Sequence, residues 1–395
     1  MAIVRFYEDI LFNLDNNKAV CAIFLDLSKA FDSVNKNILL GKLYRCGIRG
    51  NTHDLINSYL SNRKQFIQIN DIKSESCSTM IGVPQGSCLS PLLFLILIND
   101  IQNYTNLKVI NFADDTLLYH KIDDPNNFEI LLNSEFHKVI SWLNINHLKL
   151  NTSKTNYMIF SPKSPKFKEL NNITLKSGKN TIINKVTHCK YLGMIIDDKL
   201  NWNQHISNLS IKLAKIVGIL YKIRYYVNKT SLVLILHSLL ISSIKYGIMC
   251  YGRANQTNLK PIKVLFNRAL RCINFLKRRD KRTSQIYFDH GLLNFDDMFK
   301  LELGKFCYKF NNNLLPKSFD SFLTYIPSIH SHNTRNSINN YYINRQIKNT
   351  GCTTINYLGP KLWRNIPFHV KSQKSVFLFS YSYKRHMLNS YIQQE

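Results

Sequence analysis

Apolar residues in the first half of the chain follow a mixture of the short strand period and the longer helical period. The run Cys21-Ala-Ile-Phe-Leu25 is wholly apolar and Asp26 follows it at once, a pattern typical of a buried strand. Residues 108–120 predict a hairpin with Asp114 and Asp115 at its turn. Helices are expected over 3–14, 38–46, 90–100 and 126–146, strands over 66–70 and 156–160, and a second hairpin over about 185–196. This mixture predicts an α+β fold in which helices back an antiparallel sheet.

Beyond residue 198 the helical period dominates. Amphipathic helices are expected over 206–226, 231–246 and 259–276. The last hundred residues give a weaker pattern, with Asn-rich interruptions at 311–313 and 333–344. These changes divide the chain into three expected parts, at residues 1–198, 199–280 and 281–395.

Composition adds a strong charge bias to this picture. The 395 residues include 52 Lys and Arg but only 25 Asp and Glu, which gives a net charge of +27. Residues 200–279 contain about fourteen basic residues and no acid, and residues 321–394 contain about nine basic residues and no acid. Long segments without acids predict surfaces that face phosphates, so a nucleic acid is the expected partner. A codon bias toward Lys and Asn would not remove acids from only some regions.

Other classes of protein are disfavoured. The nine cysteines form no C-x-x-C pair, so neither a zinc ribbon nor a disulfide framework is expected. Cys272, Cys307 and Cys352 are too far apart for a zinc knuckle. The longest apolar stretch, residues 231–244, is too short to span a bilayer, and no secretory leader precedes the first helix. We therefore expect an intracellular protein without a membrane partner, in a compartment, nucleus or cytoplasm, that the sequence does not distinguish.

Three carboxylates are the strongest candidates for chemistry. Asp26 closes an apolar strand, and Asp114 and Asp115 lie at an expected hairpin turn. Carboxylates presented from strand ends suit a two-metal site for phosphoryl transfer. Each feature alone is weak evidence, because turns favour Asp for conformational reasons.

These acids belong to a series of short motifs in a fixed order. The series is Ala22-Ile-Phe-Leu-Asp-Leu-Ser-Lys-Ala-Phe-Asp32, Gly82-Val-Pro-Gln-Gly-Ser87 with Ser90-Pro-Leu-Leu-Phe94, Phe112-Ala-Asp-Asp115, Leu150-Asn-Thr-Ser-Lys-Thr155 and Tyr191-Leu-Gly193. It resembles motifs A to E in the palm of reverse transcriptases, most closely those of non-LTR (LINE-like) retrotransposons. The resemblance covers roughly residues 1–200.

The resemblance implies a reaction and a set of partners. Asp26, Asp114 and Asp115 would hold two Mg²⁺ or Mn²⁺ ions, and Leu27 would add its backbone carbonyl. The enzyme would be an RNA-directed DNA polymerase that adds dNTPs to the 3′-hydroxyl of a DNA primer on an RNA template. Protein partners are not indicated.

The resemblance also implies roles for other residues. Phe31 would lie under the incoming sugar and exclude a 2′-hydroxyl; judged alone, it would be an ordinary core residue. Gln85 and Gly86 would line the nascent base pair, where glycine permits close backbone approach. Lys154 would protonate the leaving pyrophosphate, or else is a solvated loop lysine. Tyr191, Leu192 and Gly193 would grip the primer end, or else form a plain hairpin.

Residues after 198 complete the resemblance. The basic helices over 199–280 would be the thumb, which follows the template–primer duplex by its backbone. The basic region 281–395 also resembles the tail of such elements, in His332-Asn-Thr-Arg335 and in Gly359-Pro-Lys-Leu-Trp363. Trp363 could stack on a base, although burial in a small core is the expected outcome. The run Lys277-Arg-Arg279 with Lys281-Arg282 is the nearest approach to a nuclear import signal, and duplex contact explains it equally well.

The sequence departs from the family in some places. Ser90 stands where the family usually has glycine, and Leu97 where an aromatic residue is common. Full-length relatives carry a fingers region, and often an endonuclease, before motif A. We therefore expect an N-terminally truncated copy or a partial gene model, whose activity is uncertain.

Several alternatives stay open. A viral-type RNA-dependent RNA polymerase shares the palm, and Asp32 could then read a 2′-hydroxyl, but Phe31 and the Phe-Ala-Asp-Asp spelling favour a DNA product. Group II intron and telomerase relatives are disfavoured by the C-terminal resemblance. A non-catalytic nucleic-acid-binding remnant would keep salt-sensitive binding without polymerisation. A protein of membrane surfaces is the remaining alternative.

Overall fold

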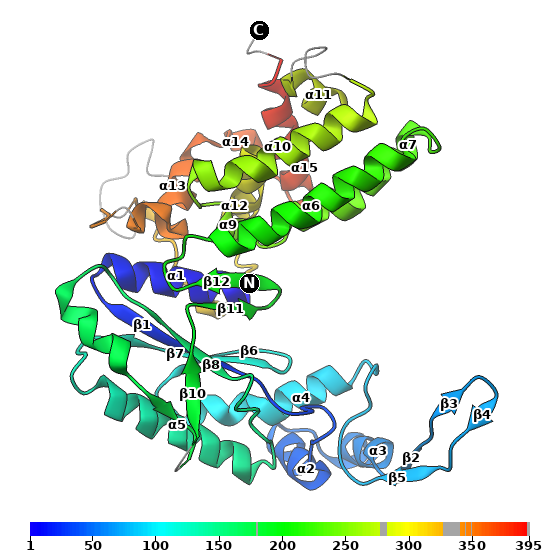
Figure 1. Cartoon of the computed structure of the whole chain (residues 1–395), viewed down its shortest axis with the longest axis vertical. Helices are drawn as coiled ribbons and strands as arrows, with labels where there is room; N and C mark the ends of the chain where they lie inside the picture. The colour runs from blue at the N-terminus through cyan, green and yellow to red at the C-terminus, as the bar shows by residue number, and fades with distance from the viewer. Residues whose placement is uncertain (179–180, 277–282, 327–339, 344, 349, 393–395) are drawn as a thin grey trace. The chain divides into compact units, whose positions relative to one another are not determined.

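A computed structural model describes the chain except residues 179–180, 277–282, 327–339, 344, 349 and 393–395 (Figure 1). Its contacts define two compact units. One consists of Asn17–Leu192, and the other joins Ile3–Asn16 to the chain from Gly193 onward. No sequence pattern predicted that the first helix belongs with the second half of the chain. The functional boundaries expected at residues 198 and 280 stay a prediction.

The first unit is built on a six-stranded sheet with the order β6-β7-β1-β8-β10-β9. The strands are β1 (Ala19–Leu25), β6 (Lys108–Phe112), β7 (Asp115–Ile122), β8 (Asn156–Phe160), β9 (Leu175–Lys176) and β10 (Ile182–Lys185). Neighbours are antiparallel except β8 and β10, which run parallel. All of β1 is buried, which explains why its sequence is apolar throughout instead of alternating. The expected α+β class is confirmed.

Three helices pack on one face of the sheet. They are α2 (Lys36–Arg45), α4 (Ser90–Ile98) and α5 (Phe128–Ile145). Cys21, Ile23 and Leu25 of β1 share one apolar core with residues of all three helices. Because successive side chains of a strand point to opposite faces, Phe24 and Asp26 face away from these helices. The candidate site therefore lies on the side of the sheet that the three helices leave open.

Local sequence accounts for these elements. Helix α4 begins at Ser90 with Pro91 in its first turn, as the sequence predicts. Strand β8 covers the same residues, 156–160, that the alternation indicated, and α5 ends within one residue of its expected C-terminus. These three predictions are confirmed because each rests on a strong local signal.

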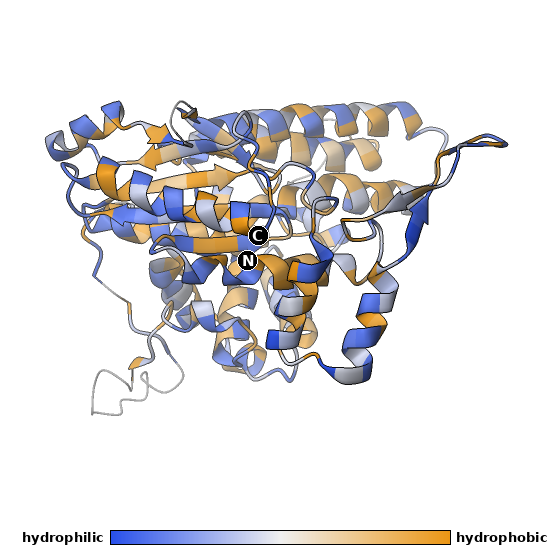
Figure 2. Ribbon diagram, turned by 90° about the horizontal axis from the view of Figure 1, so that it is seen from below, coloured by the Kyte–Doolittle hydropathy of each residue, from blue (hydrophilic) through white to orange (hydrophobic). Residues whose placement is uncertain are grey.

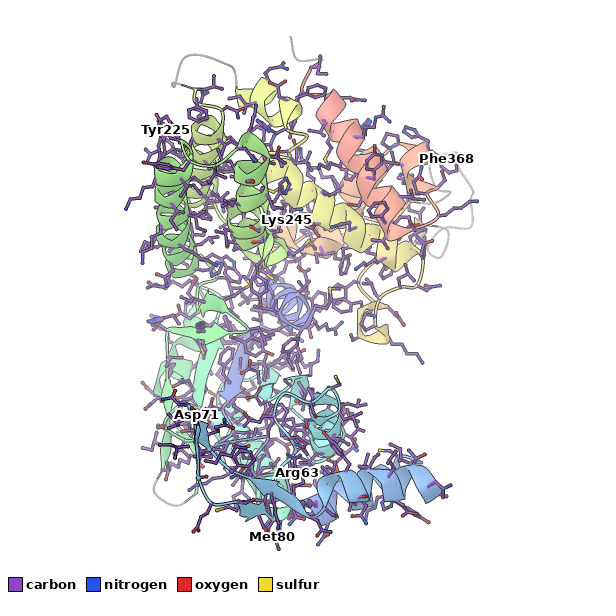
Figure 3. All side chains as sticks on the ribbon, turned by 90° about the vertical axis from the view of Figure 1, so that its right-hand side faces the viewer. Arg63, Asp71, Met80, Tyr225, Lys245 and Phe368 are labelled. Atoms are coloured by element: carbon purple, nitrogen blue, oxygen red, sulfur yellow. The ribbon has the colours of Figure 1, made fainter. Side chains whose placement is uncertain are left out.

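A narrow β arm follows α3 (Gly50–Leu60). Strands β2 (Arg63–Gln65) and β5 (Cys77–Thr79) pair at its base, and β3 (Gln68–Ile69) and β4 (Ile72–Lys73) pair toward its tip. Figure 3 labels Arg63 and Met80 near the base and Asp71 at the tip. The strand expected over 66–70 is only partly confirmed. Between the two pairs, the backbone N–H of Ser74 donates to the Ile67 carbonyl at 2.8 Å, but the N–H of Ile67 donates to the Ser74 hydroxyl and not to a backbone carbonyl.

The second unit is helical. Its helices are α1 (Ala2–Asp15), α6 (Asn203–Ile223), α7 (Lys229–Ile235), α8 (Ser242–Lys245), α9 (Ile248–Tyr251), α10 (Gln256–Ile273), α11 (Thr283–Asp289), α12 (Phe295–Asn311), α13 (Ile355–Asn365), α14 (Phe368–Lys371) and α15 (Val376–Asn389). The short strand β12 (Met194–Asp197) precedes α6. Helices coloured by hydropathy in Figure 2 carry both apolar and polar stretches, as amphipathic elements do.

The Asp197 carboxylate binds the backbone just before the first residue of helix α6. The two oxygens of Asp197 accept hydrogen bonds from the backbone N–H groups of Asn201 and Trp202, at 2.8 and 2.6 Å. The long helix that follows packs against α10. The helix expected over 231–246 is present, but a π-helical segment, Leu236–Ile241, separates α7 from α8. Periodicity alone does not reveal such a change of pitch.

Helix α1 is attached to the C-terminal part of the chain by buried polar contacts. The Glu8 carboxylate binds the guanidinium of Arg253, and these side chains are only 6% and 1% exposed. Glu8 also accepts the backbone N–H of Ile355 at 2.7 Å. Asp15 accepts the backbone N–H groups of Lys348 and Gly351, at 2.8 and 3.2 Å. These contacts join segments that are 245 to 347 positions apart in sequence.

The C-terminal region has its own small core. Trp363 is 1% exposed and packs against Phe379, with 6.0 Å between ring centroids, so its expected burial is confirmed. The segments His332-Asn-Thr-Arg335 and Lys277–Arg282 lie outside the described residues. Within the described part of the chain, no helix is long and apolar enough to cross a bilayer.

Candidate active site

The end of β1 and the β6–β7 turn meet at one end of the sheet. Leu25 pairs with Thr116 in the antiparallel register of β1 and β7. The next step of that register puts Asp26 beside Asp115. Asp114 occupies the turn and follows Ala113, whose φ of +53° allows the tight reversal. The sheet therefore brings together the three carboxylates that the sequence singled out.

The electrostatics of Asp115 reflect this grouping. Partial burial raises the pKa of its carboxyl above the usual range, and the negative charges of Asp114 and Asp26 raise it further. Both charged groups that act on it are acids, so repulsion among the carboxylates is not offset by a neighbouring base. A bound cation would relieve this repulsion.

The 151–155 loop fixes the position of Asp26. This loop leads into β8, which pairs with β1 on the edge opposite β7. The side-chain amide of Asn151 donates to Asp26 Oδ2 at 2.8 Å, and its backbone N–H donates to the Asp26 carbonyl at 2.9 Å. The backbone N–H of Asp26 donates to Thr155 Oγ1 at 3.2 Å, and Thr155 is fully buried. Ser153 in turn donates to Asn151 Oδ1 at 2.7 Å. The 151–155 loop thus holds both the backbone and the carboxylate of Asp26.

The same loop determines where the backbone of Leu27 points. Leu27 and Leu150 form an antiparallel bridge, with hydrogen bonds from Ser28 to Lys149 and from Asn151 to Asp26 on either side. In such a non-hydrogen-bonded pair, the carbonyl groups point away from the facing strand. The carbonyl of Leu27 is therefore directed away from the loop and is not used to hold it.

Phe31 lies in a turn that contacts the loop before α4. Its ring packs on Phe94, with 5.0 Å between centroids, and is half-buried. The backbone N–H groups of Gly82 and Val83 donate to the carbonyls of Val34 and Phe31, at 2.8 and 2.9 Å. Gly82 has a φ of +90°, and a Cβ there would lie 2.9 Å from the Asp32 carbonyl. Only glycine fits this close approach without strain.

Gln85 is oriented by the residue after Phe31. Its amide nitrogen donates to Asp32 Oδ1 at 2.8 Å. Gly86 follows with a φ of +80° and open space where a Cβ would be. The structure thus brings Phe31, Gln85 and Gly86 to one turn-and-loop assembly, as the motifs predict.

Strand β11 (His188–Tyr191) lies near the acids. Burial, and after it the charge of Asp115, raises the pKa of the Cys189 thiol to about 11 and that of the Tyr191 phenol beyond its usual range. Tyr191 packs on Phe24, with 5.5 Å between centroids, and its buried hydroxyl has no partner among the described residues. Leu192 and Gly193 follow with φ of +46° and +75°.

Comparison with known proteins identifies the fold of this assembly. A family model described as "Reverse transcriptase (RNA-dependent DNA polymerase)" matches residues 5–196. The matched residues thus form a reverse transcriptase domain. That match includes all five motifs, and with them Asp26, Asp114 and Asp115.

Its relatives are proteins of mobile elements. Two from Drosophila melanogaster are a probable RNA-directed DNA polymerase from transposon X-element, 25% identical over 281 residues, and the RNA-directed DNA polymerase from mobile element jockey, 26% identical over 282. Each alignment covers 68% of this chain and 30% of the relative, so the chain spans about 30% of their length. The chain is therefore similar to RNA-directed DNA polymerases of LINE-like mobile elements.

A solved structure is also similar in part. It is a telomerase from Candida albicans in complex with a fragment of telomeric RNA, 13% identical in sequence. The alignment covers 80% of this chain and 51% of that chain, with a TM-score of 0.34.

Reverse transcriptases depend on divalent metal ions, and the residues of this chain suit one. Carboxylate and carbonyl oxygens are the ligands that Mg²⁺ prefers. After partial burial, the negative charges of Asp114 and Asp26 raise the pKa of Asp115, and a bound cation would offset this repulsion. Among the described residues, no three acidic, His or Cys side chains already form a metal cluster, so the carboxylates are neighbours without making a closed cage.

Two residues of this reverse transcriptase that contact the acids were missed by sequence reasoning. Asn151 and Thr155 stand in the same motif as Lys154, and only Lys154 was singled out. The ammonium group of Lys154 forms no hydrogen bond or ion pair with another described residue, and its side chain is exposed. A signal was available, because Asn and Thr next to a strand end favour side-chain bonds to backbone.

Proposed function

We propose that this chain is the catalytic part of an RNA-directed DNA polymerase, which adds dNTPs to a primer 3′-hydroxyl on an RNA template. The observation that carries the proposal is the β1–β7 register, which sets Asp26 beside Asp115 in a chain of this family. Asp26, Asp114 and Asp115 would hold two Mg²⁺ or Mn²⁺ ions, with Leu27 adding its carbonyl. When bound, the ions would activate the attacking hydroxyl and stabilise the leaving pyrophosphate.

The substrates would be positioned by residues around the acids. Phe31 would lie under the sugar of the dNTP and exclude a 2′-hydroxyl, and its packing on Phe94 would keep the ring in place. Gln85 and Gly86 would contact the nascent base pair. Tyr191, Leu192 and Gly193 would hold the primer end. Lys154, exposed and free to move, would protonate the leaving pyrophosphate.

The rest of the chain would bind the nucleic acid. Helices within residues 199–280 would act as a thumb for the template–primer duplex, and the basic region 281–395 would add further phosphate contacts. Supporting this, exposed Lys212, Lys215 and Lys222 lie along α6 in a segment without acids. Contacts of this kind are independent of sequence and weaken with salt.

One contact bears on the choice between DNA and RNA as product. A viral-type RNA polymerase would use an acid after the first motif Asp to read the ribose 2′-hydroxyl. Asp32 is the candidate, but its Oδ1 already accepts the amide of Gln85. This bond favours a role in orienting Gln85, and with it the DNA polymerase.

Primer extension on an RNA template with an annealed DNA primer tests the proposal. With dNTPs and Mg²⁺ or Mn²⁺, the full chain should extend the primer, and Asp114→Asn should abolish extension while leaving duplex affinity and its salt dependence unchanged. Asp54→Asn, which removes an exposed acid on α3, is the matched control and should retain activity. Salt-sensitive binding without extension would make the chain a non-catalytic nucleic-acid-binding remnant instead.

A further inference from the structure

A pocket in the helical unit lies among four elements that carry basic side chains. Its volume is about 250 Å³. His237 comes from the π-helical segment, Lys245 from α8, Lys305 from α12 and Lys384 from α15. Lys245, which lines this pocket, is labelled in Figure 3. Four basic groups from four separate segments thus converge on one cavity.

The charges in this pocket are poorly balanced. Partial burial lowers the pKa of both Lys245 and Lys384. The charge of Glu302 opposes this effect at Lys245, whereas the positive charge of Lys245 lowers the pKa of Lys384 further. The pKa of His237 is also lowered by burial and then by these two lysines. Glu302 is the carboxylate nearby, and it accepts a hydrogen bond from Lys305 at 2.8 Å. Neither Lys245 nor Lys384 forms an ion pair with a described residue, so an anion is the ligand that this arrangement favours.

The rest of the lining is apolar and partly aromatic. Leu292, Leu293 and Met298 are buried in its wall. Phe377 and Tyr381 stand at the rim, 77% and 59% exposed. Exposed aromatic rings beside basic groups suit a base that stacks while its phosphate binds a cation. The volume of about 250 Å³ lies just below the roughly 300–1,000 Å³ range of ligand sites, which suits a small ligand such as one nucleotide unit.

We propose that this pocket binds a single unpaired nucleotide of an RNA strand, with its phosphate on Lys245 and Lys384 and its base against Tyr381 or Phe377. A paired base is stacked inside its duplex and cannot enter a pocket, so the site selects single-stranded RNA. The thumb contacts proposed above follow a duplex by its backbone and need no pocket. This inference goes beyond the polymerase function and does not depend on it.

Binding of a short single-stranded RNA to the full chain, measured by fluorescence anisotropy across salt concentrations, tests the proposal. Lys245→Gln with Lys384→Gln should weaken binding at least about ten-fold and reduce the salt slope by about 0.7, the value for one single-strand phosphate contact. Lys260→Gln with Lys374→Gln removes the same charge from exposed positions outside the pocket and should have a much smaller effect.

Stacking is tested separately from charge. Tyr381→Ala should weaken binding of the single strand roughly five-fold or more without changing the salt slope. Phe368→Ala removes an exposed ring on α14, labelled in Figure 3, and should leave affinity unchanged. An RNA carrying 4-thiouridine should crosslink to peptides that contain His237 or Tyr381.

Three results would overturn the proposal. The first is an equal loss of affinity in the pocket lysine pair and in the control lysine pair. The second is a loss in Lys245→Gln with Lys384→Gln that is as large for a duplex as for the single strand. The third is crosslinking only to peptides from other parts of the chain. If uridine monophosphate alone competes as well as the strand, the ligand is a free nucleotide and the strand assignment is wrong. Failure of primer extension by the wild type would remove the polymerase proposal and leave this one intact.

Discussion

The side-chain amide of Asn151 donates a hydrogen bond of 2.8 Å to Asp26 Oδ2, across 125 positions of sequence. The backbone of Asn151 bonds to the backbone of the same aspartate at 2.9 Å. Asn151 therefore controls both where the Asp26 carboxylate points and where its strand ends. It would act as a positioning residue for the metal site.

Replacing Asn151 should slow catalysis through Asp26. A hydrogen bond to a charged group contributes about 1.5–3 kcal/mol, so Asn151→Ala should lower the extension rate roughly 10- to 150-fold. It should also raise the Mg²⁺ concentration needed for half-maximal rate, which steady-state extension over a Mg²⁺ series would measure. Ser153→Ala removes only the hydroxyl that bonds to Asn151 and should cost much less. Wild-type rate and Mg²⁺ dependence in Asn151→Ala would contradict a positioning role.

Removing the charge of Asp115 should stabilise the metal-free protein. The pKa of Asp115 is higher in the folded chain than its ordinary 3.8, so its ionisation opposes folding at neutral pH. Asp115→Asn should therefore raise the urea midpoint at pH 7 in EDTA. Asp115 is exposed, so the gain in free energy of unfolding should stay within about 1 kcal/mol.

The pH dependence of this gain in stability follows from the raised pKa of Asp115. The gain should vanish as pH falls below 3.8, where the carboxyl is protonated in both folded and unfolded states. Mg²⁺ should reverse the order at pH 7 by stabilising the wild type more than the variant. A gain that persists at low pH would show that packing, not charge, is responsible.

Phe31 should control the choice of sugar. Phe31→Val makes room beside the incoming nucleotide, so incorporation of rNTPs relative to dNTPs should rise at least about ten-fold, or about 1.4 kcal/mol in discrimination. Single-nucleotide extension with matched dNTP and rNTP would measure the ratio of kcat/KM values. Phe94→Leu is the control: it changes the ring that packs against Phe31 but keeps the Phe31 side chain itself. The same sugar ratio in all three proteins would identify Phe31 as an ordinary core residue.

The ion pair of Glu8 and Arg253 should be important for stability of the helical unit. Glu8→Gln leaves the Arg253 charge buried without its partner, which typically costs about 3–5 kcal/mol. Urea unfolding followed by circular dichroism would measure it. Asp296→Asn breaks a more exposed pair with Lys263 and should cost no more than about 1 kcal/mol. An equal loss of unfolding free energy in the two variants would mean that the buried ion pair contributes no more to stability than the exposed one.

Sequence predicted well what depends on neighbouring residues. Strand β8 and the ends of the β6–β7 hairpin follow from local alternation and turn residues, and the start of α4 follows from Ser90-Pro91. The metal-binding role of the acids was inferred from a motif series, and the register then set Asp26 beside Asp115.

What sequence could not predict depends on contacts between distant segments. Nothing in the local pattern of residues 3–14 indicates a partner near residue 350, because Glu8 and Asp15 look like surface acids of an amphipathic helix. The bond from Gln85 to Asp32 and those from the 151–155 loop to Asp26 are equally remote in sequence. Such contacts are set by the packing of the whole unit, which periodicity does not encode.

The bond between Glu8 and Ile355 has a consequence for the order in which parts of the chain can fold during synthesis. The two residues are separated by 347 positions. A ribosome that adds about 5–20 residues per second completes α1 roughly 17–70 s before the segment that holds it. During that interval Glu8 lacks its bond to Ile355, although Trp202 and Arg253, which also contact α1, are made earlier. The sheet unit contains no residue beyond Leu192, so it can fold first, while α1 waits for the last part of the chain to emerge.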